Sequence, residues 1–227
     1  MTTDFSDLGY KGYREVWAYQ EEQLAAMVRA KVSGESVRGQ VLFVEHPPVY
    51  TIGKSGHAAN MLLNEAQLAA RQVECIPVDR GGDITFHGPG QLVVYPLLDL
   101  DSLHIGVKEY VHRLEEAVIR TLEAYGIRGE RVAGATGVWL DRETPQERKI
   151  CAIGVKCSRS ITMHGLALNV NTDLSYFNDI NPCGFVDKGV TSIAREIGHP
   201  VDFEETKTRL REQFRHIVLT GSDQENE

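Results

Sequence analysis

Several features that would assign a function at once are missing from this sequence of 227 residues. No apolar run approaches the roughly 18 residues that a membrane span needs. The first residues, MTTDFSDLGYKGYREVW, are acidic and polar, unlike a secretory signal or an arginine-rich transit peptide. The sequence has only four cysteines and no C-x-x-C pair, which excludes a zinc knuckle or a thioredoxin-type motif. We therefore expect a cytoplasmic protein with reduced thiols and no membrane contact.

An excess of positive charge is missing too. The sequence has 24 lysines and arginines against 32 acidic residues, a formal net charge of -8, so we expect no nucleic-acid partner. Walker, H-E-x-x-H and G-x-S-x-G motifs are absent. The histidines His46, His57, His87 and His164 are too scattered in the sequence to indicate a metal site. The sequence thus predicts neither a cofactor nor a metal.

What the sequence does contain is sufficient for one sizeable core, with 42% hydrophobic and 25% charged residues. Apolar periodicity predicts helices over 13–31, 63–70, 107–125, 192–197 and 203–218. It predicts strands over 40–45, 49–53, 74–79, 83–88, 91–100, 131–134, 137–140, 149–158 and 161–171. Because the strands come in consecutive groups, we expect an α+β, two-layer α/β domain over 1–219 with a mixed or mostly antiparallel sheet. Residues 220–227, TGSDQENE, are expected to form a disordered tail.

The segment 80–91, RGGDITFHGPGQ, combines a glycine pair with Arg80 and His87. A glycine pair lets the backbone approach a ligand closely, and these two side chains flank that approach. The competing interpretation is a tight turn followed by a hairpin loop, since glycine marks turns more often than sites.

Two further segments carry candidate groups. Lys149 opens the segment 148–159, RKICAIGVKCSR, where the alternative is a solvated lysine at a strand end. Cys151 and Cys157 lie among apolar residues, so we expect both in the core, and we expect His164 to be structural. In NPCG, Cys183 is held in a loop between proline and glycine, a place suited to a reactive thiol, although buried inert cysteines are common.

Taken in order, these segments resemble the lipoate-biosynthesis octanoyltransferases, the LipB family. The resemblance covers about residues 41–190 and rests on EHPPVYT (45–51), RGGDITFHGPGQLVVYP (80–96), GVW (137–139), KICAIGVKCSRSITMHGLALNVNTDLSYF (149–177) and NPCG (181–184). It implies a single domain related to biotin and lipoate protein ligases. It also implies that an octanoyl group moves from octanoyl-acyl carrier protein to a lysine of lipoyl domains, in 2-oxoacid dehydrogenases and the glycine cleavage H protein.

The resemblance also implies roles for particular residues. Cys183 would be the acyl-thioester nucleophile and Lys149 its activating partner. The residues expected to line the acyl site are Arg80, Gly81, Gly82, Asp83, Ile84, Thr85, Phe86, His87, Ala152, Ile153, Gly154, Gly165, Leu166 and Ala167. Phe86 and Asp83 depart from the tyrosine and glutamine common in the family, so a phenol or amide contact is not expected at those positions.

Three other functions fit the same residues. They are an ATP-dependent lipoate ligase, a thiol hydrolase that pairs the cysteine with His87 or His164, and a binding module for acyl carrier protein or lipoyl domains without catalysis. For any of these, acidic partners would need local positive charge. Arg148, Lys149, Lys156 and Arg159, opposed by Glu147 alone, form the basic docking patch that the sequence predicts.

Overall fold

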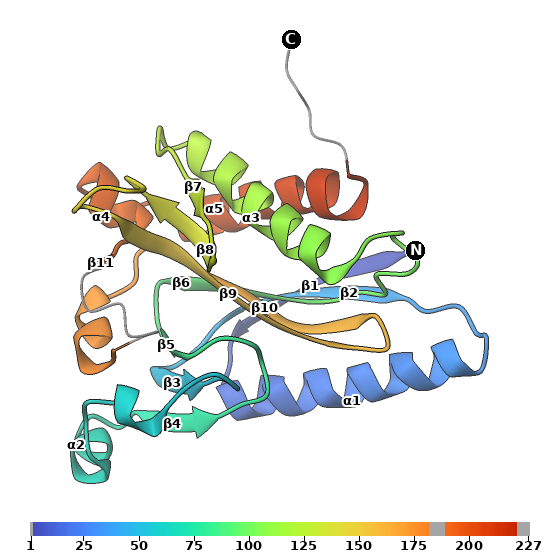
Figure 1. The fold of residues 1–227 in the computed structure, drawn as a ribbon, viewed down its shortest axis with the longest axis horizontal. Coiled ribbons are helices and arrows are strands. Elements are labelled where there is room, and N and C mark those ends of the chain that lie inside the picture. Colours follow the sequence, from blue (N-terminus) through green and yellow to red (C-terminus); the bar gives the residue numbers. More distant parts are fainter. Residues whose placement is uncertain (1, 182–188, 222–227) are drawn as a thin grey trace.

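A large mixed sheet crosses the molecule (Figure 1). This computed structural model describes residues 2–181 and 189–221. The strand order is β1-β2-β6-β10-β9-β8-β7, with β11 paired to β9. The strands span Thr3–Tyr10 (β1), Gly39–Glu45 (β2), Gln91–Leu97 (β6), Glu130–Val132 (β7), Ala135–Leu140 (β8), Arg148–Ser158 (β9), Ile161–Asn169 (β10) and Gly189–Val190 (β11). The β1–β2 and β9–β11 pairs are parallel and the other pairs are antiparallel.

A small second sheet lies beside the large one, on the side of α1 (Figure 1). It has the order β4-β3-β5 and is built from Val49–Ile52 (β3), Glu74–Pro77 (β4) and Ile84–His87 (β5). The short helix α2, Glu65–Ala70, precedes β4 and carries a complete capping box between Asn64 and Gln67. The loop between β4 and β5 contains the glycine pair that the sequence singled out.

Helices cover both faces of the large sheet (Figure 1). Helix α1, Tyr13–Val32, packs Val16, Leu24 and Met27 into one core with Val93 and Ala167 of the sheet. On the opposite face are α3, Val107–Glu123, and α5, Phe203–Gln213, which continues into a π-helical turn, Phe214–Leu219. The short helix α4, Ile193–Ile197, follows β11. The strands of the large sheet therefore have two apolar faces, which explains their nearly unbroken apolar runs.

The predicted α+β class with a mixed, mostly antiparallel sheet is confirmed. The sequence missed β1, because this edge strand is largely exposed and lacks the alternation of a half-buried strand. The expectation that Cys157 lies in the core was wrong, since it is exposed near the end of β9, whereas Cys151 is fully buried. Both thiols are free, as is that of Cys75. Most of the predicted tail, 222–227, lies outside the described residues.

No helix in the described part of the chain is both long enough and apolar enough to cross a membrane.

Candidate active site

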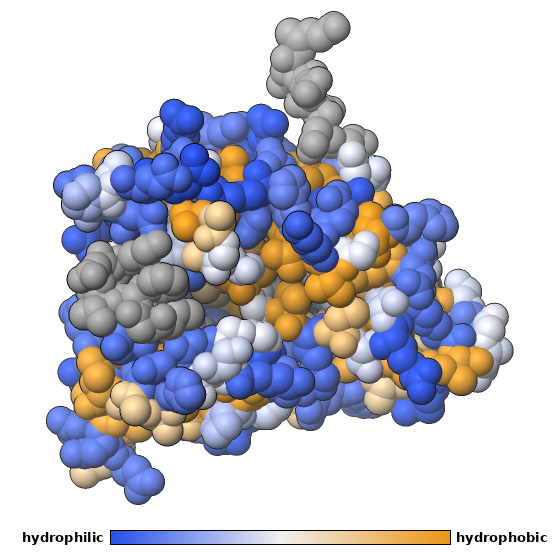
Figure 2. Space-filling view, in the orientation of Figure 1, coloured by the Kyte–Doolittle hydropathy of each residue, from blue (hydrophilic) through white to orange (hydrophobic). Residues whose placement is uncertain are grey.

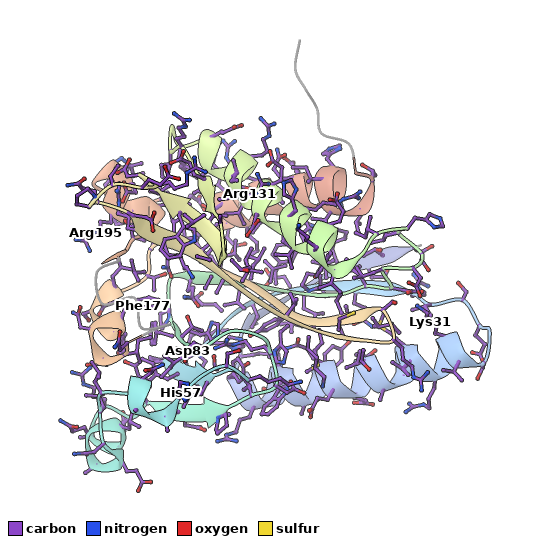
Figure 3. The ribbon with its side chains drawn as sticks, in the orientation of Figure 1. Lys31, His57, Asp83, Arg131, Phe177 and Arg195 are labelled. Carbon is purple, nitrogen blue, oxygen red and sulfur yellow. The ribbon has the colours of Figure 1, made fainter. Side chains whose placement is uncertain are left out.

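A cavity of 390 Å³ lies where the small sheet and its loop meet the α1 face of the large sheet. Figure 2 shows apolar surface gathered in the middle of the face in view, between more polar surface above and below. The lining comes from β5 and the loop before it, from β6, β8, β9 and β10, and from Tyr13, Phe177, Gly189 and Val190. Figure 3 marks two of these residues, Asp83 and Phe177. Segments far apart in the sequence thus line one cavity.

The cavity brings together most of the residues singled out from the sequence. Lys149 lines it, as do Arg80, Gly82, Asp83, Ile84, Thr85, His87, Ala152, Ile153, Gly154, Gly165, Leu166 and Ala167. Gly81 and Phe86 do not; Phe86 is buried and stacks on Tyr176 with ring centroids 4.4 Å apart. Cys183 lies outside the described residues. Phe177 and Gly189, which precede and follow its segment in the sequence, line the same cavity.

Small residues form the floor of the cavity. Two cross-strand pairs of β9 and β10, Ala152–Ala167 and Gly154–Gly165, make up this small-residue floor, with the pair Ile153–Leu166 between them. A Cβ on Gly154 would lie 2.7 Å from the Gly81 carbonyl oxygen, and one on Gly165 would lie 2.1 Å from that of Val94. Both positions therefore require glycine, because a larger residue would displace the backbone that packs against it.

Arg80 anchors the loop before β5. It is buried, and its Nη2 donates to the Thr51 carbonyl oxygen at 2.8 Å and to Thr51 Oγ1 at 2.9 Å, while Nη1 donates to the Gly81 carbonyl oxygen at 3.0 Å. Asp83 accepts from Asn60 Nδ2 at 2.6 Å and from the Ile84 backbone N–H at 2.7 Å. These bonds fix the loop against β3, so that it forms one wall of the cavity.

A buried polar network missed by the sequence analysis joins the loop to the far strands. Gln91 Oε1 lies 2.8 Å from His87 Nδ1, and Gln91 Nε2 donates to Asn169 Oδ1 at 2.9 Å. Asn169 Nδ2 in turn donates to the Thr191 carbonyl oxygen at 3.0 Å. Gln91 and Asn169 end two motifs quoted above, GPGQ and LALN, and an amide residue directly beside an apolar strand was the signal available in the sequence. Burial holds the pKa of His87 well below its ordinary value, so its imidazole is neutral at pH 7.

Lys149 lies beside an aromatic ring rather than at a solvated strand end. Its Nζ is 4.4 Å from the ring centroid of Trp139, whose Nε1 donates to the Ala135 carbonyl oxygen at 2.8 Å. The Lys149 carbonyl oxygen accepts from the Thr191 N–H at 2.9 Å, directly after β11. The bond from Trp139 fixes the indole, and the ring face favours a cation above it. The ammonium group thus belongs to the cavity wall.

The prediction that the docking patch carries a net positive charge was wrong. Arg148 pairs with Asp141, and its Nη2 lies 2.5 Å from Glu196 Oε2. Lys156 pairs with Asp79. Asp141, Glu196 and Asp79, which all lie outside the predicted segment, thereby neutralise two of the four expected cations.

Asp79 also contacts His164. The His164 side chain is buried, as expected of a structural residue, but it also lines the cavity. His164 Nε2 lies 2.9 Å from Asp79 Oδ1. Burial lowers the pKa of His164 to about 4, against the opposing effect of Asp79. Burial raises the pKa of Asp79, but its bonds to Lys156 and His164 lower it by more, so the carboxylate is ionised at neutral pH.

Comparison with known proteins identifies the kind of molecule that carries this cavity. The family profile described as the lipoyl protein ligase A/B catalytic domain matches residues 12–215. The chain belongs to this family. Its relatives include an octanoyltransferase of Bacteroides thetaiotaomicron, 56% identical over 210 residues, which cover 92% of this chain and 92% of the relative. Another is the octanoyltransferase of Bacteroides fragilis strain ATCC 25285, 53% identical over 220 residues, with 97% and 98% covered.

Solved structures of lipoate protein ligases share the fold. A lipoate-protein ligase A bound with ATP superposes with a TM-score of 0.73 at 16% identity, covering 95% of this chain and 85% of the other. A bipartite lipoate protein ligase from Thermoplasma acidophilum gives 0.63 at 14% identity, covering 94% and 82%. Identities this low support the fold alone. The curated relatives show that the present family member is an acyltransferase enzyme, which sets aside the non-catalytic binding module.

Proposed function

We propose that this acyltransferase moves an octanoyl group from octanoyl-acyl carrier protein to the lysine of lipoyl domains. The acceptors would be the lipoyl domains of 2-oxoacid dehydrogenases and the glycine cleavage H protein, and the reaction would take place in the cytoplasm. The names of the curated relatives support octanoyl transfer, and the match to the lipoyl protein ligase A/B family supports its place in lipoylation. No cofactor is needed in this proposal.

One observation carries the proposal. Lys149 lines the same cavity as Phe177, six residues before Cys183, and Gly189, six residues after it. The proposal requires the Cys183 thiol to reach this cavity near the Lys149 ammonium. The apolar walls beside it, which include Ile153 and Leu166, suit an alkyl chain, because each buried methylene contributes about 0.8 kcal/mol.

The reaction balances in two steps without ATP. In the first, the Cys183 thiolate attacks the thioester carbonyl of the donor, the bond to the carrier sulfur breaks, and the carrier thiolate takes a proton from the Lys149 ammonium group. In the second, the neutral amine of the acceptor lysine attacks the acyl-enzyme, an amide bond forms, and Cys183 is released as the thiol. The first step exchanges one thioester for another, and the second converts a thioester into a more stable amide.

Lys149 serves both steps in this proposal. A cation beside a thiol favours the thiolate, and at 4 Å with an effective dielectric of 20 the attraction is about 4 kcal/mol. Once the acyl group is on sulfur and Lys149 has given its proton to the leaving carrier, the neutral Lys149 amine can accept the proton that the acceptor amine must lose. The neighbouring Trp139 ring limits where the ammonium can lie, which keeps it at the cavity wall.

The test is intact mass spectrometry after mixing the protein with octanoyl-acyl carrier protein. We expect one octanoyl addition that is lost in Cys183→Ala and retained in the control Cys157→Ala, whose thiol is exposed and does not line the cavity. Subsequent addition of a lipoyl domain should discharge the acyl group onto its lysine. An octanoyl addition that survives in Cys183→Ala contradicts the proposal, and release of free octanoate in place of transfer favours the thiol hydrolase.

A further inference from the structure

A buried carboxylate on α3 has no part in the proposed reaction. Glu115 is 8% exposed, and its Oε1 accepts from the Gly137 backbone N–H at 3.0 Å. Its Oε2 lies 3.2 Å from Nε of Arg131, which Figure 3 labels beside α3. Burial of a carboxylate is unfavourable unless it is paired and hydrogen-bonded, and these two groups meet both conditions. Glu115 thus connects α3 to the main chain of β8, the strand that pairs with β9.

The strand β9, which carries Lys149, is irregular where it pairs with β8. Val138 of β8 pairs with Cys151 of β9. The next residue of β8, Trp139, pairs with Lys149. Ile150 is therefore an extra residue in β9, the arrangement called a β-bulge. The packing agrees, since Ile150 and Cys151 both belong to the core against α3 and neither lines the cavity. Successive residues of a regular strand would point to opposite faces.

The bulge determines which face of the sheet Lys149 occupies. Lys149 and Cys151 are two residues apart, so in a regular strand their side chains would share the apolar core. Lys149 instead lines the cavity, and its Nζ lies 4.4 Å from the ring centroid of Trp139 on the facing strand. Bulges next to active sites redirect side chains in this way. The position of the ammonium therefore depends on the irregular pairing of β8 with β9.

Gly137 is the residue of β8 that makes room for this pairing. Its φ of +122° is one that residues with a side chain rarely adopt. A Cβ on Gly137 would overlap the Cys151 carbonyl oxygen and would lie 3.5 Å from Lys149 Cε. The Lys149 side chain therefore passes beside the same glycine whose N–H is bonded to Glu115. Both charges also act on the Cys151 thiol, whose pKa is raised by burial and by Glu115 and lowered by Lys149.

We propose that Glu115 is a positioning residue, which holds Gly137 and the β9 bulge in the geometry that presents the Lys149 ammonium to the cavity. The inference rests on the proposed function, since it takes Lys149 to be the group that favours the Cys183 thiolate. Without the acceptor from Glu115, the Gly137 N–H is buried without a partner, and the bulge loses a bond that favours it over regular pairing. The ammonium then stabilises the thiolate less, and the pKa of the thiol rises.

Two conservative substitutions separate the hydrogen bond of Glu115 from its charge. Glu115→Asp keeps the charge but shortens the side chain by one methylene, about 1.5 Å, which takes the acceptor out of range of the Gly137 N–H. Glu115→Gln keeps an acceptor oxygen at the original length and removes the charge. Both keep a polar side chain at the same site of α3, so both variants are expected to fold.

The readout is the pH profile of octanoyl-enzyme formation from pH 6 to pH 9. A thiol whose pKa rises from about 6.5 to about 7.5–8.5 loses about 3- to 25-fold of its thiolate at pH 7. Glu115→Asp should slow octanoyl-enzyme formation by that factor at pH 7 and move the midpoint of the profile to higher pH by the same change in pKa. Glu115→Gln should retain the wild-type midpoint, because its amide oxygen still accepts from Gly137.

Glu116 provides the matched control. It is adjacent to Glu115 and shares Arg131, whose Nη2 lies 2.5 Å from Glu116 Oε2, but the carboxylate that accepts from Gly137 is that of Glu115. Glu116→Asp should therefore leave the midpoint unchanged. A second measurement needs no acyl donor. Alkylation of Cys183 by iodoacetamide across the same pH range, followed by peptide mass spectrometry, reports the pKa of the thiol, with the exposed Cys157 as internal reference.

The outcomes are distinguishable. If Glu115→Asp keeps the wild-type midpoint, or lowers the rate equally at every pH as a general structural defect would, the positioning role is overturned. If Glu115→Gln moves the midpoint as far as Glu115→Asp does, the hydrogen bond is not what acts, and the proposal is likewise overturned. If the unmodified protein transfers no octanoyl group, the proposed function fails, and the alkylation midpoints still decide the role of Glu115.

Discussion

Replacing Lys149 by methionine separates the catalytic contribution of its charge from its structural contribution. Methionine keeps much of the length of the side chain and removes the ammonium. Lys149 is half-buried, and its ammonium lies 4.4 Å from the Trp139 ring centroid, a contact of about 1 kcal/mol. For a protein of this size that loss lowers the melting temperature by about 2–4 °C. Lys149→Met is therefore expected to remain folded at assay temperature.

The expected effect on acylation is much larger. A thiol with an ordinary pKa near 8.5 is about 3% ionised at pH 7, and a thiol with its pKa two units lower is about three-quarters ionised. If Lys149 supplies that difference to Cys183, Lys149→Met slows acyl-enzyme formation about 25-fold at pH 7. The deficit should shrink towards pH 9, where an ordinary thiol ionises unaided. Lys149→Arg should retain acylation but slow the transfer to the lipoyl lysine, because arginine does not accept the proton.

Rapid-quench mass spectrometry of the octanoyl-enzyme from pH 6 to pH 9 measures this. The control is Lys207→Met, since Lys207 also lies over a ring, 5.5 Å from the Phe203 centroid, but does not line the cavity. It should lower the melting temperature and leave the acylation rate unchanged. Wild-type acylation by Lys149→Met at pH 7 would refute the assigned role of the charge. A deficit that does not depend on pH would assign Lys149 to positioning instead of thiol ionisation.

Two further predictions concern the frame around the cavity. Gly165→Ala places a Cβ 2.1 Å from the Val94 carbonyl oxygen, and such overpacking costs about 1–3 kcal/mol. The melting temperature measured by calorimetry should therefore fall by several degrees. An unchanged melting temperature would contradict the packing of β10 on β6. Bonds from Arg148 outweigh burial in lowering the pKa of Glu196, so its stabilisation is fully present above the unfolded value of 4.5 and is lost as pH falls through the lower pKa of the folded state. Glu196→Gln should therefore unfold at a lower temperature than wild type at pH 7, and the difference should shrink as pH falls below 4.5; a difference that stays constant on acidification would contradict the assignment.

Local patterns in the sequence predicted the elements that have a buried face. Helix α3 shows this, because Leu114, Val118 and Leu122 recur at helical spacing and are fully buried. The apolar pattern gave wrong predictions for residues that are exposed despite their apolar neighbours. Val107 belongs to the same apolar stripe yet is 42% exposed at the first turn of the helix. Cys157 lies among apolar neighbours but is exposed near the end of β9.

Some residues of the candidate site could be predicted from the sequence, and others could not. Motifs that resemble a known family indicated Lys149 and the acyl-binding segments, because acyl transfer restricts which residue types can activate a thiol or line an acyl site. No local pattern indicated that His164 adopts a positive φ or that it contacts Asp79, which is 85 residues away in the sequence. Nor did the sequence show that Gln91 and Asn169 link separate strands.

The amino-acid sequence by itself determined which segments become strands and helices and which residue types are available for acyl transfer. Both depend on side-chain chemistry and on spacing along the chain. Tertiary structure alone decided that residues from opposite ends of the sequence enclose one cavity, and which cations remain near it after distant carboxylates pair with the others. Those properties depend on distances between segments that strand pairing and core packing establish, and no local pattern encodes them.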